Sequence, residues 1–268
     1  MSGRGVAAAL AAALGAAAVA PSPAQPGCAP ADHTTRVAGG GECLAIRTFR
    51  PAAPGDAPRL AVFIHGDVSA GGPADYVFRW AARAVTDGTV VVAILRPGYG
   101  DSEGNLSTGE AHGRQDHYTR HNVDAVGAAV KALREHHRAS RVVLAGHSGG
   151  AAFAGVIIGR HPGVADGAVL VACSCDIPQW RHRRGRPWPH SLSPHALVKQ
   201  VPTSTRVVSL TGDRDDNTTP DLARDYVKDL AQRGVAARFV AVAGAAHNDV
   251  IRAPEVDAAI TGLLAADG

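Results

Sequence analysis

Residues 141–160, RVVLAGHSGGAAFAGVIIGR, join two different patterns without a gap. Residues 141–145 form a short aliphatic run of the kind found in strands that are covered on both faces. Residues 151–160 have helical periodicity. The GHSGG segment between them fits G-x-S-x-G, in which glycines permit a sharp turn that lifts the serine above a sheet. The stretch therefore predicts a buried strand, a tight turn and a helix, with the hydroxyl of Ser148 exposed at the turn.

The same alternation extends along most of the chain. Similar aliphatic runs occupy residues 60–64, 89–95, 168–172, 206–210 and 238–242. Helical periodicity covers about residues 74–85, 119–136, 220–233 and 254–265. Repeated strand–helix alternation predicts an α/β fold, with a mostly parallel central sheet and helices on both faces. No long linker divides the pattern, so we expect one domain over residues 36–268.

Composition excludes several other classes of protein. Of 268 residues, 46% are hydrophobic and 19% charged, which is enough apolar material for a core. The 31 glycines and 17 prolines follow no repeat, which argues against a collagen-like chain. The net charge is only +3 and no basic stripe with interleaved aromatics extends along the chain, so we expect no nucleic-acid partner.

The N-terminus has the pattern of a secretory signal. Arg4 precedes an uninterrupted apolar run over residues 6–20, which is too short for a typical membrane span. Cleavage is possible after Ala20 or after Ala24, and Pro21 makes the first site unfavourable. We therefore expect a signal peptide over residues 1–24, an N-terminal segment over 25–35, a secreted or periplasmic location and no stable membrane span after cleavage. The alternative is a buried, alanine-rich helix.

Export would make the four cysteines candidates for disulfides. Pairing of Cys28 with Cys43 would hold the N-terminal segment, and we expect this bond. Cys173 and Cys175 are two residues apart, so a bond between them would be strained. A metal site at this second pair would need a matching pair of ligands that the chain lacks. We expect neither a metal nor another cofactor.

A serine hydroxyl is a weak nucleophile and needs a histidine that is oriented by an acid. After a nucleophile on this kind of turn, the acid precedes the histidine along the chain. His247, in the segment GAAH after the last strand, is the one histidine beyond His195. The segment LTGDRDDNTTP, residues 210–220, supplies three candidate acids, Asp213, Asp215 and Asp216.

Five motifs in order resemble the α/β-hydrolase superfamily over about residues 58–268. They are His65-Gly66, residues 96–104 (RPGYGDSEG), the GHSGG turn, Gly212-x-x-Asp215 and Gly244-x-x-His247. The resemblance implies the α/β-hydrolase fold and a catalytic triad of Ser148, Asp215 and His247. Asp215 is chosen because the family pattern places a proline five residues later, where this chain has Pro220. The relatives implied are serine esterases, dienelactone-hydrolase-like enzymes and prolyl-oligopeptidase-like catalytic domains.

A tetrahedral intermediate also needs backbone N–H groups that bind its oxyanion. Gly149, the residue after the nucleophile, supplies one donor, and we expect Asp67 to supply the second, with Val68 as the alternative. A carboxylate beside an oxyanion is unfavourable, so the side chain of Asp67 should point away or be paired.

The segment 176–202 interrupts the alternation and lies where this superfamily often has a lid. Trp180 and Trp188 could line a substrate pocket there. Arg181 and the neighbouring Arg183, Arg184 and Arg186 could hold a substrate carboxylate, although a solvated basic loop is the plainer interpretation.

We expect a secreted serine hydrolase that cleaves small carboxylic esters through an acyl-enzyme on Ser148. One alternative is a small peptidase or amidase of the prolyl-oligopeptidase type, suggested by the run Asp215-Asp216-Asn217. Another is a non-catalytic binding protein on the same fold. The sequence does not indicate the oligomeric state.

Overall fold

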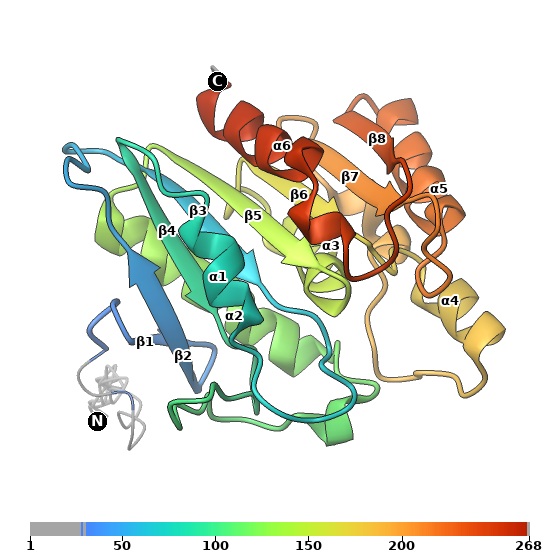
Figure 1. Ribbon diagram of the computed structural model, residues 1–268, viewed down its shortest axis with the longest axis horizontal. Helices are drawn as coiled ribbons and strands as arrows, with labels where there is room; N and C mark the ends of the chain where they lie inside the picture. The colour runs from blue at the N-terminus through green and yellow to red at the C-terminus, as the bar shows by residue number, and fades with distance from the viewer. Residues whose placement is uncertain (1–27, 29–30, 267–268) are drawn as a thin grey trace, which may run out of the picture.

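The strands of the computed structural model form a single sheet, shown in Figure 1. The model describes Cys28 and residues 31–266, so the signal peptide expected over residues 1–24 lies outside the described part. Within that part, eight strands follow the order β1-β2-β4-β3-β5-β6-β7-β8. They are β1 (Arg36–Gly39), β2 (Glu42–Phe49), β3 (Arg59–Ile64), β4 (Thr89–Ile94), β5 (Arg141–His147), β6 (Gly167–Val171), β7 (Arg206–Gly212) and β8 (Ala236–Val242).

The sheet is parallel from β4 to β8 and antiparallel at its other edge, where β1 pairs with β2 and β2 with β4. Six strands match the aliphatic runs of the sequence, which confirms the expected mostly parallel sheet. β1 and β2 were not among the strands predicted from the sequence. They form an edge ribbon in which β1 has partly or fully exposed positions and the apolar run of β2 stops after residues 43–46, so neither is apolar along its whole length as a central strand is.

Helices cover both faces of the sheet, as predicted. Alternate residues of β3 point to opposite faces, so Leu60, Val62 and Ile64 pack with one helical layer and Ala61 and Phe63 with the other. The first layer contains α2 (Arg120–His137), α3 (Gly149–Arg160) and α5 (Pro220–Gln232). The second layer contains α1 (Tyr76–Ala82) and α6 (Pro254–Ala265), which lie in front of the sheet in Figure 1.

The segment 176–202 is more ordered than the sequence suggests. It contains α4 (Ile177–Arg184) and a 3-10 helix, His195–Gln200. Asp176 begins α4 by accepting a hydrogen bond from the backbone N–H of Gln179 (3.0 Å), and Pro178 occupies a first-turn position. The helix was missed because its two turns are strongly basic and have no apolar stripe. None of the helices described is both long and apolar enough to cross a membrane.

Parallel strands bring the loops at their carboxyl ends to one edge of the sheet. The turn after β5, the loop after β7 and the loop after β8 therefore meet, although they are far apart in the sequence. These loops carry Ser148, Asp215 and His247.

Candidate active site

Ser148 lies on a sharp turn between β5 and α3 and has a positive φ, which non-glycine residues rarely adopt (φ 54°, ψ −118°). The turn requires glycine at two positions, one before and one after the serine. A Cβ atom on Gly146 would come within 2.2 Å of the carbonyl oxygen of Gly150. A Cβ atom on Gly150 would lie 2.1 Å from the carbonyl oxygen of Ile64 on the adjacent strand. The G-x-S-x-G pattern therefore reflects steric need, and the packed surroundings hold the serine in a strained conformation.

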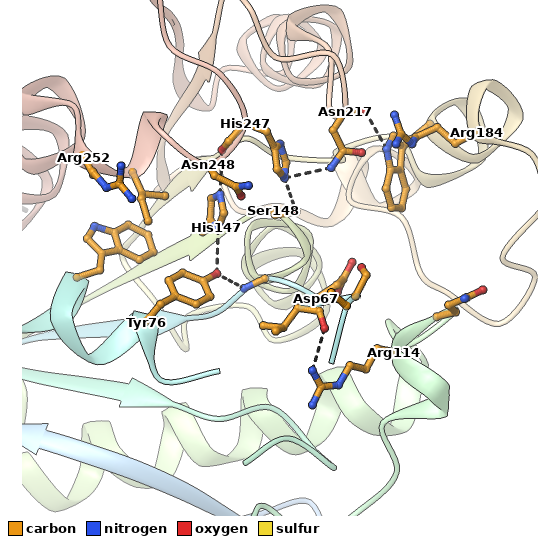
Figure 2. Close-up of a pocket in the computed structure, with 18 of the residues that line it drawn as sticks. Asp67, Tyr76, Arg114, His147, Ser148, Arg184, Asn217, His247, Asn248 and Arg252 are labelled. Atoms are coloured by element: carbon orange, nitrogen blue, oxygen red, sulfur yellow. Dashed lines mark hydrogen bonds between the residues drawn. The ribbon is translucent and has the colours of Figure 1, made fainter. Parts of the chain in front are cut away.

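The structure brings Ser148, His247 and Asp215 into one hydrogen-bonded chain; the first two lie near the centre of Figure 2. The Oγ atom of Ser148 lies 3.0 Å from Nε2 of His247, and Nδ1 of His247 lies 2.8 Å from Oδ2 of Asp215. Because a carboxylate only accepts, the proton of His247 belongs on Nδ1, which leaves Nε2 as an acceptor for the serine hydroxyl. This is the arrangement that makes a serine nucleophilic.

Asp215 is buried and well provided with donors. Its Oδ1 accepts the backbone N–H groups of Asn217 and Thr218, both at 2.9 Å, and its Oδ2 accepts the hydroxyl of Thr218 at 2.9 Å. Burial raises the pKa of Asp215, but the hydrogen bonds from His247 and Thr218 outweigh that effect and hold the pKa below its ordinary value. The carboxyl group is therefore ionised and able to orient His247.

The other two candidate acids are engaged elsewhere. Asp213 accepts a hydrogen bond from the backbone N–H of Gly244 (2.8 Å), which joins the loops after β7 and β8. The side chain of Asp216 is exposed. Of the three acids in this run, Asp215 is the one bonded to His247.

The loop after β3 runs directly beside Ser148. A Cβ atom on Gly66 would lie 3.1 Å from Cβ of Ser148, and one on Gly149 would lie 2.2 Å from Oδ1 of Asp67. Gly149 opens α3, so its N–H has no acceptor within the helix. The backbone N–H of Asp67 donates to no atom of the described residues. The two expected oxyanion donors therefore lie next to each other beside the serine.

The carboxylate of Asp67 is paired, although it also borders the pocket. Its Oδ1 accepts from Nη2 of Arg96 (3.0 Å), and its Oδ2 accepts from the hydroxyl of Tyr118 (2.7 Å). Arg96 is fully buried, and the same Nη2 also donates to the carbonyl oxygen of Gly66 (2.8 Å). The guanidinium thus offsets the negative charge that would otherwise repel an oxyanion.

A second hydrogen-bonded chain connects this loop to the loop of His247. The N–H of Gly66 donates to the hydroxyl oxygen of Tyr76 (2.6 Å), and Tyr76 donates to Nδ1 of His147 (2.9 Å). Nε2 of His147 donates to the carbonyl oxygen of His247 (3.1 Å). Burial and the nearby His247 lower the pKa of His147 to about 4, in keeping with a neutral ring. The chain fixes the distance between the two loops.

A cavity of about 720 Å³ opens over Ser148 and His247. Trp180, Trp188 and Arg181, the substrate-binding candidates of the sequence analysis, all line it. The α4 helix is attached to the loop of Asp215 through the indole N–H of Trp180, which donates to the carbonyl oxygen of Asn217 (3.0 Å). The segment 176–202 therefore forms one wall of the cavity, and its closure as a lid stays a prediction.

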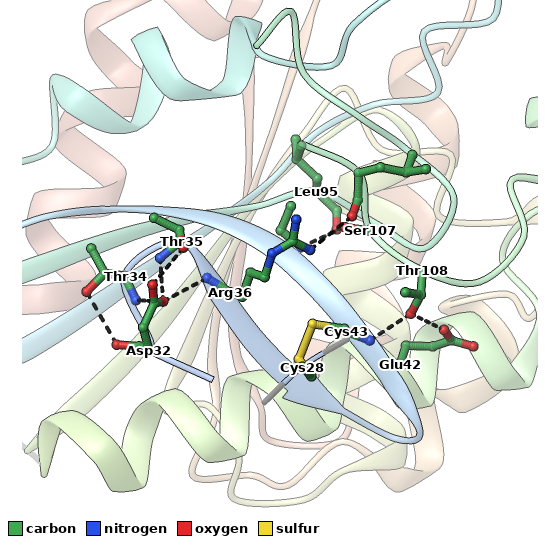
Figure 3. Close-up of a disulfide and its surroundings, with 12 residues drawn as sticks. Cys28, Asp32, Thr34, Thr35, Arg36, Glu42, Cys43, Leu95, Ser107 and Thr108 are labelled. Atoms are coloured by element: carbon green, nitrogen blue, oxygen red, sulfur yellow. Dashed lines mark hydrogen bonds between the residues drawn. A yellow bond between two sulfur atoms is a disulfide. The ribbon is translucent and has the colours of Figure 1, made fainter. Parts of the chain in front are cut away.

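All four cysteines are bonded in the structure. Cys28 is bonded to Cys43 at the start of β2, as expected, and Figure 3 shows the bond. The second bond joins Cys173 to Cys175, which were disulfide candidates from the sequence, although their two-residue spacing argued for a strained bond. These two cysteines follow β6 and are fully buried, next to the segment that carries α4.

Several polar residues of the site were quoted in the sequence motifs without a role, or were missed. Arg96 lies two residues after the end of β4, and a cation just beyond a buried strand is a usable signal. His147 lies within the GHSGG turn. Tyr76, Tyr118 and Arg114 come from helical or irregular segments, and only the tertiary structure brings them to the loop after β3.

The sheet order, the strained turn and the hydrogen-bonded serine, histidine and aspartate define the class as the α/β-hydrolase superfamily. The chain belongs to the family described as "Serine aminopeptidase, S33", whose sequence profile matches residues 56–251. The resemblance noted from the five motifs is therefore confirmed. A search among curated protein sequences finds no match.

Solved structures with the same fold include esterases and peptidases. Est1E from Butyrivibrio proteoclasticus, with ferulic acid bound, superposes with a TM-score of 0.66 at 15% identity, covering 85% of this chain and 97% of that one. A puromycin-hydrolyzing peptidase from Mycobacterium tuberculosis superposes with a TM-score of 0.65 at 18% identity, covering 84% of this chain and 36% of that one. An esterase from the archaeon Pyrobaculum calidifontis superposes with a TM-score of 0.60 at 18% identity, covering 86% of this chain and 80% of that one.

Proposed function

We propose that this protein is a serine hydrolase that cleaves carboxylic esters through an acyl-enzyme on Ser148. The observation that carries the proposal is the unbroken chain from Ser148 through His247 to Asp215. Its position on a strained turn, beside two backbone N–H groups, supplies what acyl transfer requires.

In the proposed reaction, Oγ of Ser148 attacks the ester carbonyl carbon while its proton moves to Nε2 of His247. The oxyanion that forms is bound by the N–H groups of Gly149 and Asp67. His247 then gives the proton to the departing alkoxide, and an alcohol leaves the acyl-enzyme. A water molecule attacks the acyl group, again with His247 as base, and the collapse of the second intermediate restores Ser148 and releases the acid.

The family name makes an aminopeptidase the second candidate. Aminopeptidases bind a substrate with a cationic amino terminus, and an anionic group must receive it. Among the described residues that line the cavity, Asp67 is the only carboxylate, and Arg96 already pairs with it. This charge distribution favours an ester or another neutral or anionic acyl substrate over a peptide with a free amino terminus.

We extend the proposal to an exported enzyme. The signal pattern over residues 1–24 supports it, and so do two disulfides, because such bonds persist mainly outside the cytosol.

The test is ester turnover by Ser148→Ala. We expect kcat/KM for 4-nitrophenyl butyrate to fall by at least about 10³-fold, with the thermal unfolding transition retained. Labelling by a fluorophosphonate probe should also be lost. Ser204→Ala is the matched control, because Ser204 is exposed and precedes β7, at the end of that strand opposite the loop of Asp215. Equal activity in the Ser148 variant would refute the mechanism. A clear preference for aminoacyl anilides over aryl esters would favour the peptidase.

A further inference from the structure

The cavity over Ser148 is lined by an excess of positive charge. Asp67 is the one carboxylate among its lining residues in the described part of the chain, and it is paired with Arg96. The lining includes six arginines, Arg79, Arg83, Arg114, Arg181, Arg184 and Arg252. This concentration is unexpected in a chain whose net charge is only +3.

Three of these arginines, Arg114, Arg181 and Arg184, form what we call the arginine wall. Their guanidinium groups donate to backbone carbonyls: Arg114 to Val68 (2.8 Å) and Gly72 (2.7 Å), Arg181 to Arg186 (2.8 Å), and Arg184 to Asp216 (3.3 Å). No carboxylate of the described residues lies within ion-pair distance of any of the three. Their positions are thus held while their charges stay uncompensated.

Arg181 is the most constrained member of the arginine wall. Its guanidinium lies over the ring of Trp188, 4.7 Å from the centroid, and 5.1 Å from that of Trp180. Burial lowers the pKa of Arg181; the positive charge of Arg184 acts in the same direction, while Tyr118 and the carboxylates of Asp67 and Asp116 oppose the shift without cancelling it. A bound anion would place an opposite charge beside both guanidinium groups.

The neighbouring Arg183 provides an internal contrast. It lies on the same helix, α4, but does not line the cavity. It forms two hydrogen bonds to the carboxylate of Asp221, at 3.1 Å and 2.7 Å, and a third to the hydroxyl of Thr219. The helix thus neutralises one of its cations and leaves the two that face the cavity unpaired.

Two of the three remaining arginines of the lining lie beside a carboxylate. Arg83 pairs with Asp257 (3.2 Å), and Arg252 lies 3.5 Å from Asp249. Figure 2 shows Arg114 and Arg184 on one side of Ser148 and Arg252 on the other. Arg79 lines the cavity as well and has no carboxylate partner among the described residues, so three of the four unpaired arginines of the lining belong to the arginine wall.

We propose that the arginine wall is a subsite for a carboxylate, and that the substrate is an ester carrying a carboxylate on one of its two parts. The proposal rests on the ester hydrolysis proposed above and specifies its substrate class. A guanidinium matches a planar carboxylate with two parallel hydrogen bonds. Trp180 and Trp188 offer an apolar surface beside the guanidinium groups, so an aliphatic or aromatic spacer fits between the carboxylate and the ester.

Two matched pairs of esters test the subsite on either side of the scissile bond. The acyl pair is 4-nitrophenyl hydrogen adipate and 4-nitrophenyl hexanoate, and the alcohol pair is 4-acetoxybenzoate and its methyl ester. In at least one pair we expect the anionic member to have a kcat/KM about tenfold higher, mostly through KM. The preference should weaken as salt is added, because the guanidinium groups are partly exposed.

The variants locate the effect. Arg181→Gln with Arg184→Gln should bring the ratio of kcat/KM for the anionic ester to kcat/KM for the neutral ester close to one, because a neutral substrate has no partner for the guanidinium groups. Arg183→Gln, the matched control on α4, should retain the preference. No preference in either pair, or a preference that survives in the double variant, would overturn the proposal.

A binding measurement separates this proposal from the proposed function. Titration of adipate into Ser148→Ala by calorimetry reads the subsite without any turnover. Binding that the two glutamines weaken by about tenfold supports the subsite. Absence of binding refutes it, even where neutral esters are hydrolysed. If no ester is turned over, the proposed ester hydrolysis is refuted, and the proposed substrate class is refuted with it.

Discussion

The two sides of the pocket differ in whether their charged side chains have partners of opposite charge. Beneath Ser148, Asp215 is bonded to His247, Asp67 to Arg96, and the buried His147 is neutral. On the arginine wall, the guanidinium groups of Arg181 and Arg184 have backbone or aromatic partners only. The difference follows exposure, because an unpaired charge is costly in the interior and far less so where water reaches it. Charge that a protein leaves uncompensated at a wet surface is charge that a ligand can use.

The largest effect should come from the paired side. In Asp215→Asn the shape is kept, but the amide no longer favours the Nδ1–H tautomer of His247, so Nε2 cannot accept the serine proton. We expect kcat for a neutral aryl ester to fall by about 10³- to 10⁴-fold. Asp213→Asn is the matched control from the same loop and should change kcat by less than about threefold. Comparable losses in the two variants would show that the acid has been misassigned.

The next largest effect should be on the free energy of unfolding, which a substitution on the paired side should lower more than one on the arginine wall. Asp67→Asn leaves the fully buried Arg96 without its counter-charge, and we expect the free energy of unfolding in urea to fall by about 3 kcal/mol. Arg184→Gln removes a cation that has no carboxylate partner, so the change should stay within about 0.5 kcal/mol. If both variants were equally stable, Asp67 and Arg96 would not act as a buried pair, and the contrast between the two sides would fail.

Acidification should destabilise the folded protein through the neutral histidines of its interior. Burial lowers the pKa of His117 to about 3 and that of His147 to about 4. An unfolded chain binds these protons near pH 6.5, so between pH 7 and 5 it takes up more protons than the folded protein does. The free energy of unfolding therefore decreases as the pH is lowered from 7 to 5, by about 2 kcal/mol for each such histidine.

The variant His117→Phe keeps a ring against Phe153 and Tyr99 and removes one of these groups. We expect it to lose about 2 kcal/mol less stability than the unaltered protein between pH 7 and 5, measured by urea unfolding. His182→Gln, at an exposed position of α4, should follow the unaltered protein. An unchanged pH dependence in His117→Phe would mean that His117 is not the neutral, buried group described.

Much of the central fold could be predicted because its signals are local. The strand, glycines and helix around Ser148 lie within twenty consecutive residues, and the buried parallel strands appear as continuous apolar runs. The ribbon of β1 and β2 and the helix α4 could not be predicted in the same way. Their stability comes from partners elsewhere in the chain, such as the loop of Asp215 that receives the indole of Trp180.

The sequence by itself determined the order of the motifs, the turn at Ser148 and the identity of His247 as the base. The choice of Asp215 among the three acids of its loop came from the family resemblance alone, and the members of the run of arginines were not distinguished. Only the tertiary structure decided that Asp215 meets His247, and that Arg183 is neutralised by Asp221 while Arg181 and Arg184 face the cavity. The physical reason is that charge compensation depends on which distant side chains fold against each other, and a linear pattern does not contain those distances.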